Sequence, residues 1–156
     1  MTSVIITIVL TFMAMEGVAW LMHRFIMHGP GWIFHEDHHT KDSGLSFFER
    51  NDVFFVFFAT IAITCFGVWS LGGGTIFMSL AAGVTLYGAV YFFIHDLFIH
   101  QRIKVLTNTK NRYLKAIRRA HKMHHKHLGK EDGECFGMLW VPMKYFREEL
   151  NRKEAR

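Results

Sequence analysis

The stretch SVIITIVLTFMAMEGVAWLMHRFIMH, residues 3–28, decides the fold, because a long apolar run ends directly in a pair of histidines. Residues 3–22 carry one charged side chain, Glu16. A helix of this length crosses a hydrocarbon core of about 30 Å. A cleaved signal peptide would have basic residues ahead of its apolar core, and none precede this one. We therefore predict a retained membrane-spanning helix over residues 3–22.

Two further apolar runs follow, at residues 53–71 and 75–94, and the apolar character of the latter continues to Ile99. The glycines at 72–74 fit a tight turn between them. The run at 135–146 is interrupted by Pro142 and is too short to span, so we expect it to lie at the interface or to cover the metal site. The prediction is an all-α integral membrane protein with three or four transmembrane helices, forming a single domain over residues 1–156.

The charges are segregated from the apolar runs. The formal net charge is +5, yet Lys and Arg are absent from residues 1–23 and from residues 51–101. Three spans place every histidine, lysine and arginine at one face of the membrane, and the positive-inside rule assigns that face to the cytoplasm. We expect a histidine-rich cap that binds two metal ions on this side. Cys65 and Cys135 suggest neither a disulfide framework nor a CxxC site.

Ten of the eleven histidines fall into four motifs in the order HxxxxH, HxxHH, HxxxxH, HxxHH. This order is a two-fold internal echo, and one histidine, His127, falls outside it. We predict that all ten are metal ligands: His23, His28, His35, His38, His39, His95, His100, His121, His124 and His125.

The two spacings place the rings differently on a helix. Residues three and four apart share a face, so HxxHH can hold one ion and extend a further imidazole toward a neighbouring ion. Five residues correspond to about 500° of rotation, which leaves the HxxxxH pair about 140° apart on an ideal helix. We therefore expect the helix to end or to distort within each HxxxxH motif.

Ten imidazole donors are too many for one ion and suit two. Imidazole binds iron, copper, zinc and nickel. A nitrogen-rich site that activates O2 needs a redox-active metal, so iron is the first choice and copper the second. Zinc can occupy the same ligands in a purified sample without supporting redox chemistry.

The motifs and their flanking residues resemble a known family. The resemblance rests on HRFIMHGPGWIFHEDHH at 23–39, ND at 51–52, YGAVYFFIHDLFIHQR at 87–102 and RRAHKMHHKHLGKEDGECFGMLWVP at 118–142. The histidine spacing is similar to that of the membrane fatty acid hydroxylase and desaturase superfamily. The flanking segments resemble its bacterial β-carotene 3-hydroxylase branch, and the resemblance covers nearly the whole chain.

This resemblance implies a non-haem di-iron monooxygenase in the bacterial inner membrane. Such an enzyme hydroxylates C3 of β-ionone rings with O2 and electrons from a ferredoxin-type donor, converting β-carotene to β-cryptoxanthin and zeaxanthin. Ketolated rings are a further expected substrate, which would lead from canthaxanthin to astaxanthin.

Several side chains near the motifs are candidates for orienting the imidazoles, namely Glu16, Glu36, Asp37, Glu49 and Asp96. For Glu16, a place on the substrate path and a simple polar helix contact are both open. The aromatic residues at 54–58 and 91–93 either line a substrate tunnel or face lipid. Gly83 and Gly88 either allow close helix packing or make room for substrate.

The region from Lys110 to Lys130 is strongly basic. No recognition fold accompanies it, so nucleic-acid binding is not expected. Attraction to anionic lipid and docking of an acidic ferredoxin both fit, and they can coexist.

Three other classes of function can be compared with this sequence. A fatty acid or sterol hydroxylase or desaturase, or a carotenoid ketolase, would share the histidine motifs. A metal transporter would need ionisable residues along the bilayer, where only Glu16 is found away from the border. A bis-histidine haem cytochrome would need single histidines on facing helices rather than clustered triplets.

Overall fold

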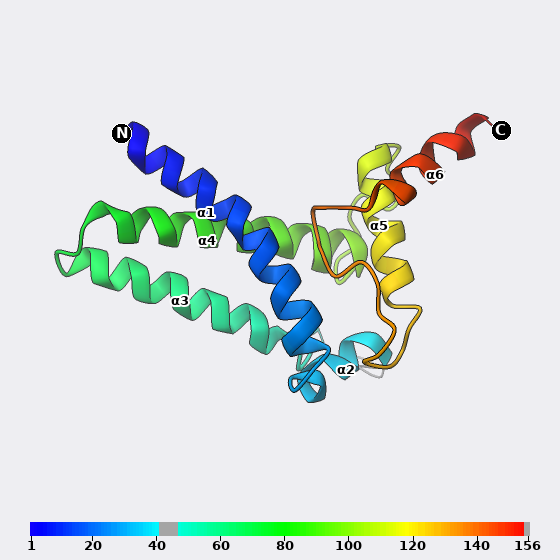
Figure 1. Ribbon diagram of the computed structural model, residues 1–156, viewed down its shortest axis with the longest axis horizontal. Coiled ribbons are helices and arrows are strands. Elements are labelled where there is room, and N and C mark those ends of the chain that lie inside the picture. The colour runs from blue at the N-terminus through cyan, green and yellow to red at the C-terminus, as the bar shows by residue number, and fades with distance from the viewer. Residues whose placement is uncertain (41–46, 155–156) are drawn as a thin grey trace.

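The structure is a computed structural model that describes residues 1–40 and 47–154. Three continuous helices dominate it (Figure 1). The first comprises α1 (Thr2–Leu21) and η1 (Met22–Met27), and the second is α3 (Asp52–Ser70). The third comprises α4 (Thr75–Tyr91) and η2 (Phe92–Ile99). Each is long and apolar enough to cross a membrane, which confirms the three predicted spans.

The helix α4 lies in the middle of the membrane part and packs against both α1 and α3. Figure 1 shows the N-terminus and the turn between α3 and α4 at one end of this bundle, and α2 and α5 at the other. Contact with α1 is close at Gly83, where an added Cβ would lie 2.6 Å from Thr11 Cβ and 2.9 Å from the Ile8 carbonyl oxygen. Gly83 therefore serves helix packing.

A polar cap covers the histidine end of the bundle. It contains α2 (Trp32–Thr40), α5 (Arg112–His124) and α6 (Met143–Glu154). The helix α5 begins where the Asn111 side chain accepts the Leu114 N–H at 3.0 Å. Ile117 on α5 packs with Ile94 and Phe98 of η2, and this small core fixes the cap to the third membrane helix.

The segments η1 and η2 are π-helical turns; each contains the first histidine of an HxxxxH motif, and the second, His28 or His100, is the next residue after it. The His28 N–H donates to the His23 carbonyl at 3.0 Å, and the His100 N–H donates to the His95 carbonyl at 2.9 Å. An i→i+5 hydrogen bond brings residues five apart close to one face of the helix. The expected distortion at both motifs is thus confirmed, and it is a widening of the helix.

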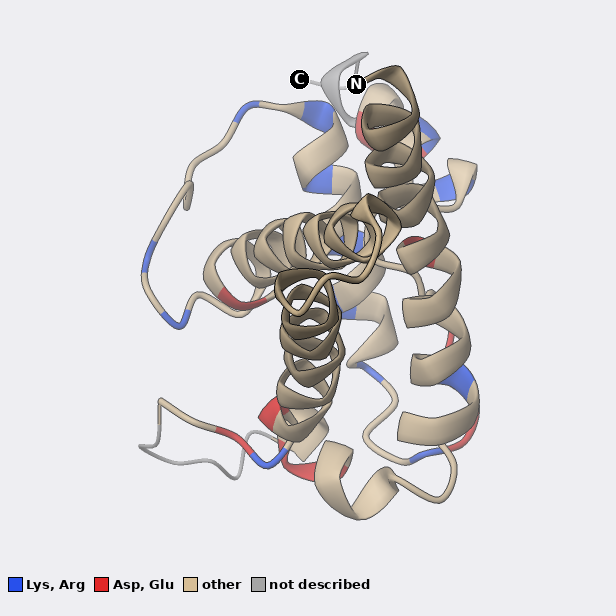
Figure 2. Cartoon of the chain, turned by 90° about the vertical axis from the view of Figure 1, so that its left-hand side faces the viewer, with Lys and Arg blue, Asp and Glu red and all other residues tan. Residues whose placement is uncertain are grey.

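The charge distribution follows this division. Figure 2 shows Lys and Arg on the cap, on connecting segments and near the histidine end of the first membrane helix, where Arg24 lies in η1, whereas α3 and α4 contain neither. The outer faces of the three long helices expose large apolar side chains such as Leu10, Ile63 and Leu86. These faces suit contact with lipid.

Candidate metal centre

The ten motif histidines meet beneath the polar cap. Nine of them form two groups, within each of which the candidate ligand atoms all lie within 4.8 Å of one another. We call them the five-histidine cluster and the four-histidine cluster. The former contains His23, His28, His35, His39 and His124, and the latter contains His38, His95, His100 and His121.

The two copies of the motif exchange one histidine. In the first copy the HxxxxH pair His23 and His28 groups with His35 and His39, and in the second copy His95 and His100 group with His121. The middle histidine crosses over, so His38 joins the four-histidine cluster and His124 joins the five-histidine cluster. This crossing is the arrangement that the HxxHH spacing predicted.

Within each cluster the rings point Nε2 atoms at one another. The Nε2–Nε2 distance is 3.1 Å for His23 and His35 and 3.2 Å for His28 and His124. In the four-histidine cluster it is 3.0 Å for His38 and His95, and 2.9 Å for His100 and His121.

For the contacts within the five-histidine cluster, the opposite ring nitrogens show that the Nε2 atoms are not hydrogen-bonded to each other. The Nδ1 atoms of His23, His28 and His124 donate to the carbonyl oxygens of Phe136, Lys130 and Glu134 at 3.0, 2.9 and 2.8 Å. A neutral imidazole carries a single N–H. Because Nδ1 carries that proton, Nε2 carries only a lone pair. The Nε2 lone pairs of neighbouring rings, such as those of His28 and His124, therefore point at each other.

A bound cation would accept these lone pairs and remove their repulsion. Two imidazole nitrogens, each about 2.1 Å from one ion and at right angles, lie about 3.0 Å apart. The observed separations of 2.9–3.2 Å match that value. Both clusters therefore have the donor type and the spacing of a metal site.

His125 is the tenth motif histidine, and its ring is also buried beside the clusters. Both of its ring nitrogens are buried without a hydrogen-bond partner, which is costly unless a ligand engages them. Its ring lies 4.4 Å from His39 of the five-histidine cluster, and 4.5 Å from His121 and 4.8 Å from His38 and His100 of the four-histidine cluster, centroid to centroid. His125 therefore lies between the two clusters, and three of these four neighbouring rings belong to the four-histidine cluster. His127 belongs to neither of these clusters.

Burial keeps the imidazoles of the cap neutral. Desolvation lowers the pKa of His39 to about 4 and that of His124 to about 3. It also lowers the pKa of His38 and His121 well below the ordinary value. Neutral imidazole is the form that binds metal, so the site is ready for ions at neutral pH.

The segment from 127 to 136 covers the clusters with its backbone. The carbonyl oxygens of His127, Lys130, Glu134 and Phe136 accept Nδ1–H groups of His39, His28, His124 and His23, respectively. The expectation that the C-terminal apolar stretch helps to cover the site thus holds at Phe136.

The five predicted carboxylates divide into separate roles. Glu49 accepts His38 Nδ1–H at 2.7 Å, and Asp96 lies 3.4 Å from His95 Nδ1. Asp37 instead accepts the Arg50 backbone N–H at 2.7 Å. Glu36 is exposed to solvent.

Glu16 lies away from the histidines. Its Oε1 accepts the backbone N–H groups of Met138, Leu139 and Trp140 at 2.9, 2.8 and 2.9 Å. Its Oε2 accepts the Tyr87 hydroxyl at 2.8 Å. The carboxylate therefore holds the C-terminal segment against the first membrane helix. Of the two roles considered for Glu16, the structure shows the polar helix contact.

Two orienting residues were missed from the sequence. Asn51 is the N-cap residue of α3, but its side chain does not cap the helix, because its oxygen accepts His35 Nδ1–H at 2.7 Å. Arg102 is buried and contacts three carboxylates: Asp52 at 2.7 Å, Asp96 at 2.9 Å and Glu49 at 3.2 Å. Its place directly after the second HxxxxH motif was the available signal for Arg102.

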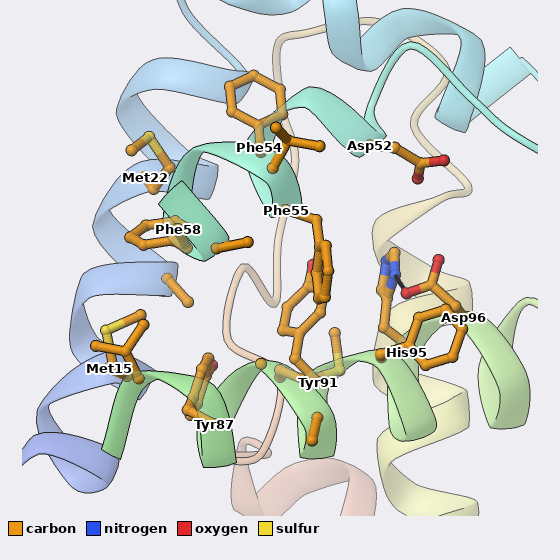
Figure 3. A pocket seen from close by; sticks show the side chains of 18 of the residues that line it. Met15, Met22, Asp52, Phe54, Phe55, Phe58, Tyr87, Tyr91, His95 and Asp96 are labelled. Atoms are coloured by element: carbon orange, nitrogen blue, oxygen red, sulfur yellow. Dashed lines mark hydrogen bonds and ion pairs between the residues drawn. The ribbon is translucent and has the colours of Figure 1, made fainter. Parts of the chain in front are cut away.

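An apolar cavity of about 730 Å³ leads to the clusters between α1, α3 and α4 (Figure 3). Figure 3 shows Met15 and Tyr87 at one end and His95 and Asp96 at the other. His23 also lines it. A cavity of this size and character suits a large apolar molecule.

Some of the aromatic residues proposed for a tunnel line this cavity, and others face outward. Phe54, Phe55, Phe58, Tyr91 and Phe92 line it, whereas Phe57 and Phe93 are exposed on the outer faces. Gly88 also lines it, and a Cβ there would meet only Phe55, at 3.8 Å. Of the two glycines on α4, Gly88 therefore makes room and Gly83 packs.

The chain is similar to known proteins over most of its length. The model of the family described as "Fatty acid hydroxylase" matches residues 8–145. The beta-carotene hydroxylase of Pseudescherichia vulneris is 40% identical over 134 residues, covering 86% of this chain and 74% of the relative.

More distant relatives include the beta-carotene hydroxylase of Paracoccus sp. (strain PC1), 35% identical over 93% of this chain and 89% of the relative. Beta-carotene 3-hydroxylase 2 of Arabidopsis thaliana is 33% identical over 90% of this chain and 45% of the relative. No solved structure matches the chain. The matched region includes all ten clustered histidines, and the chain belongs to the fatty acid hydroxylase family.

Proposed function

We propose that this protein is a membrane carotenoid hydroxylase that places a hydroxyl group on C3 of β-ionone rings. The substrates are β-carotene and β-cryptoxanthin, with zeaxanthin as the product, and canthaxanthin is a further substrate leading to astaxanthin. One oxygen atom of O2 enters the C–H bond. The other leaves as water with a pair of electrons and protons from outside.

The observation that carries this proposal is the pair of histidine clusters beside the apolar cavity. The lone-pair geometry calls for metal ions, and the cavity ends at His95 and also touches His23, one histidine from each cluster. The relatives named above supply the substrate class, because they are beta-carotene hydroxylases.

The ligand set we propose is five histidines for each of two ions. The five-histidine cluster holds one, and the four-histidine cluster together with His125 holds the other. Iron bound there supplies the activation of O2. We favour iron over copper because of the family, and zinc is the ion expected to replace it in an inactive preparation.

The chain's own residues do the rest. The carbonyl oxygens of residues 127–136 and the Asn51 and Glu49 side chains hold six of the rings in the tautomer that presents Nε2 inward. The apolar walls around Phe55 and Phe58 bind the ring and polyene while excluding water from the reacting carbon. The site lies at the cytoplasmic border of the bacterial inner membrane, supported by the positive-inside rule.

A ferredoxin-type donor docks on the basic cap in this proposal. Arg118 is unsuited to that role, because its guanidinium lies 4.0 Å from the Phe98 ring and donates to the Phe98 carbonyl. Arg119 pairs with Glu148. Lys115 and Lys122 are exposed seven residues apart on α5 and offer a better docking face. Charge reversal at both should lower turnover with ferredoxin while leaving metal content unchanged.

Expression in a bacterium that accumulates β-carotene, followed by pigment analysis, tests the function. Zeaxanthin is the expected product. His38→Ala and His124→Ala should abolish conversion, whereas His127→Ala is the matched control, since only its backbone carbonyl is used. Unchanged β-carotene with a metal-loaded protein in the membrane would refute the proposal. Hydroxylated or desaturated fatty acids or sterols in those cells would establish the alternative substrate class.

A further inference from the structure

The two histidine clusters are held from outside by different chemistry. In the five-histidine cluster, the Nδ1–H groups of His23, His28, His39 and His124 donate to backbone carbonyls, and that of His35 donates to an amide oxygen. Within residues 1–40 and 47–154, no carboxylate is hydrogen-bonded to a ring of this cluster. Its supporting acceptors are therefore all neutral.

The four-histidine cluster is supported by carboxylates. Glu49 accepts the His38 Nδ1–H at 2.7 Å, and Asp96 lies 3.4 Å from His95 Nδ1. His38 and His95 are the two rings whose Nε2 atoms lie 3.0 Å apart. The two carboxylates thus stand directly behind one pair of donor atoms.

Arg102 joins these carboxylates into one buried network. Its side chain is 8% exposed, and it contacts Glu49 at 3.2 Å and Asp96 at 2.9 Å. The same guanidinium contacts Asp52 at 2.7 Å, and Asp52 accepts the Glu49 backbone N–H at 3.1 Å. Three carboxylates surround one guanidinium, so the network adds negative charge beside the four-histidine cluster alone.

This difference changes how strongly each cluster donates to a metal. An imidazole whose N–H is bonded to a carboxylate is a more basic ligand than one bonded to a carbonyl. Excess negative charge in a buried region also favours the more highly charged ion, because little solvent screens it. Both effects act on the four-histidine cluster and in the same direction.

We infer that the two metal positions are electronically unequal, with Arg102, Glu49 and Asp96 as positioning residues for the four-histidine cluster. The inference rests on the proposed pair of iron ions. The four-histidine cluster binds its ion more tightly and holds it ferric at a lower potential. The first electron delivered to the fully oxidised protein therefore reduces the iron in the five-histidine cluster.

Mössbauer spectroscopy of the detergent-solubilised protein loaded with iron-57 tests this inference. Addition of one electron per protein should give one ferrous and one ferric site in fixed positions. Glu49→Gln and Asp96→Asn should change the component that remains ferric. Asn51→Asp, which places a carboxylate behind His35 of the other cluster, should change the component that is reduced first.

Chelator competition supplies a second measurement that a purely structural role would not produce. Loss of an orienting carboxylate of this kind lowers metal affinity by about 10- to 100-fold. Glu49→Gln should do so for one of the two ions and leave the other unchanged. Asn51→Asp should instead raise the metal affinity of the five-histidine cluster, so that the affinities of the two clusters become more similar.

The wild-type protein decides the matter even if a variant fails to fold. Two sites that accept the first electron equally, or that lose iron to a chelator at one common concentration, would overturn the inference. So would Glu49→Gln and Asn51→Asp variants that alter the same component. A protein that shows two unequal irons but leaves β-carotene unchanged would overturn the proposed function and not this inference.

Discussion

The carboxylate of Glu16, inside the first membrane helix, accepts the backbone N–H of Trp140 at 2.9 Å, across 124 positions of the chain. The same oxygen accepts the N–H groups of Met138 and Leu139. This contact fastens the segment that carries the Phe136 and Glu134 carbonyls, which hold His23 and His124. An acid in the membrane helix therefore supports the metal site from a distance.

Glu16→Ala should loosen the five-histidine cluster. It leaves three backbone N–H groups without their acceptor, and the two that are partly buried, those of Met138 and Leu139, carry most of the cost, which is about 1–3 kcal/mol for a buried group. We expect lower metal content and faster protease cleavage between residues 127 and 142. Glu16→Gln keeps an oxygen acceptor and should retain most of the metal. Glu36→Ala, at an exposed position, should match the wild type, and equal metal loss in all three variants would contradict this role.

Leucine at the two glycines of α4 should have opposite effects. Gly83→Leu forces side-chain atoms against Thr11 and the Ile8 carbonyl, so we expect a destabilisation of about 1–3 kcal/mol or more from overpacking. Gly88→Leu instead fills part of the cavity and should keep the melting temperature while reducing pigment conversion several-fold. Thermal melts and pigment analysis of both variants separate the two effects. Full conversion by Gly88→Leu would argue against substrate in this cavity.

Removing the ions should destabilise the cap. Without a cation, the Nε2 lone pairs of His28 and His124 face each other at 3.2 Å, and those of His23 and His35 at 3.1 Å. Their repulsion should loosen α5 and the segment after it, while α3 and α4 stay folded. Hydrogen exchange before and after chelation measures this, and re-adding iron should restore protection. Uniform loss of protection over the whole chain would contradict a local effect.

The metal-free protein should lose stability on acidification. Above about pH 6.5 the histidines are neutral in both the folded and the unfolded chain. Below it the unfolded chain takes up protons. The folded chain does not follow until its own lower pKa values, about 4 for His39 and about 3 for His124. Stability present above about pH 6.5 is therefore lost progressively toward about pH 4.

Thermal melts of the metal-free protein across this range test that linkage. Replacing His39 by Gln should reduce the pH dependence, because one titrating group is removed. A melting temperature that stays constant between neutral pH and about pH 5 would show that burial does not suppress protonation of these rings.

The sequence predicted the parts of this fold that repeat or that depend on bulk polarity. The three spans follow from apolar length, and the distorted helix at both HxxxxH motifs follows from rotation per residue. The HxxHH spacing anticipated a histidine shared with a neighbouring ion. It did not reveal that His38 and His124 would be those histidines, because that depends on how α2 and α5 approach each other.

Other features of the site left little trace in the residues. Backbone carbonyls such as those of Lys130 and Phe136 exist at every position, so no residue type marks the ones that hold His28 and His23. Asn51 has the residue type and position of a helix cap, but its side chain accepts a hydrogen bond from His35, which is distant in the sequence. The partners of Arg102 come from separate segments and become neighbours only after folding.

The exchange of His38 and His124 has a consequence for how the protein is made. A nascent chain that has emerged only as far as Ile99 offers His23, His28, His35 and His39 to one ion, but only His38 and His95 to the other. The five-histidine cluster lacks His124, and the four-histidine cluster lacks His121, until α5 has been synthesised. We expect ions bound there to join segments from both halves of the polypeptide, so that the complete ligand sets form only after α5 has been made.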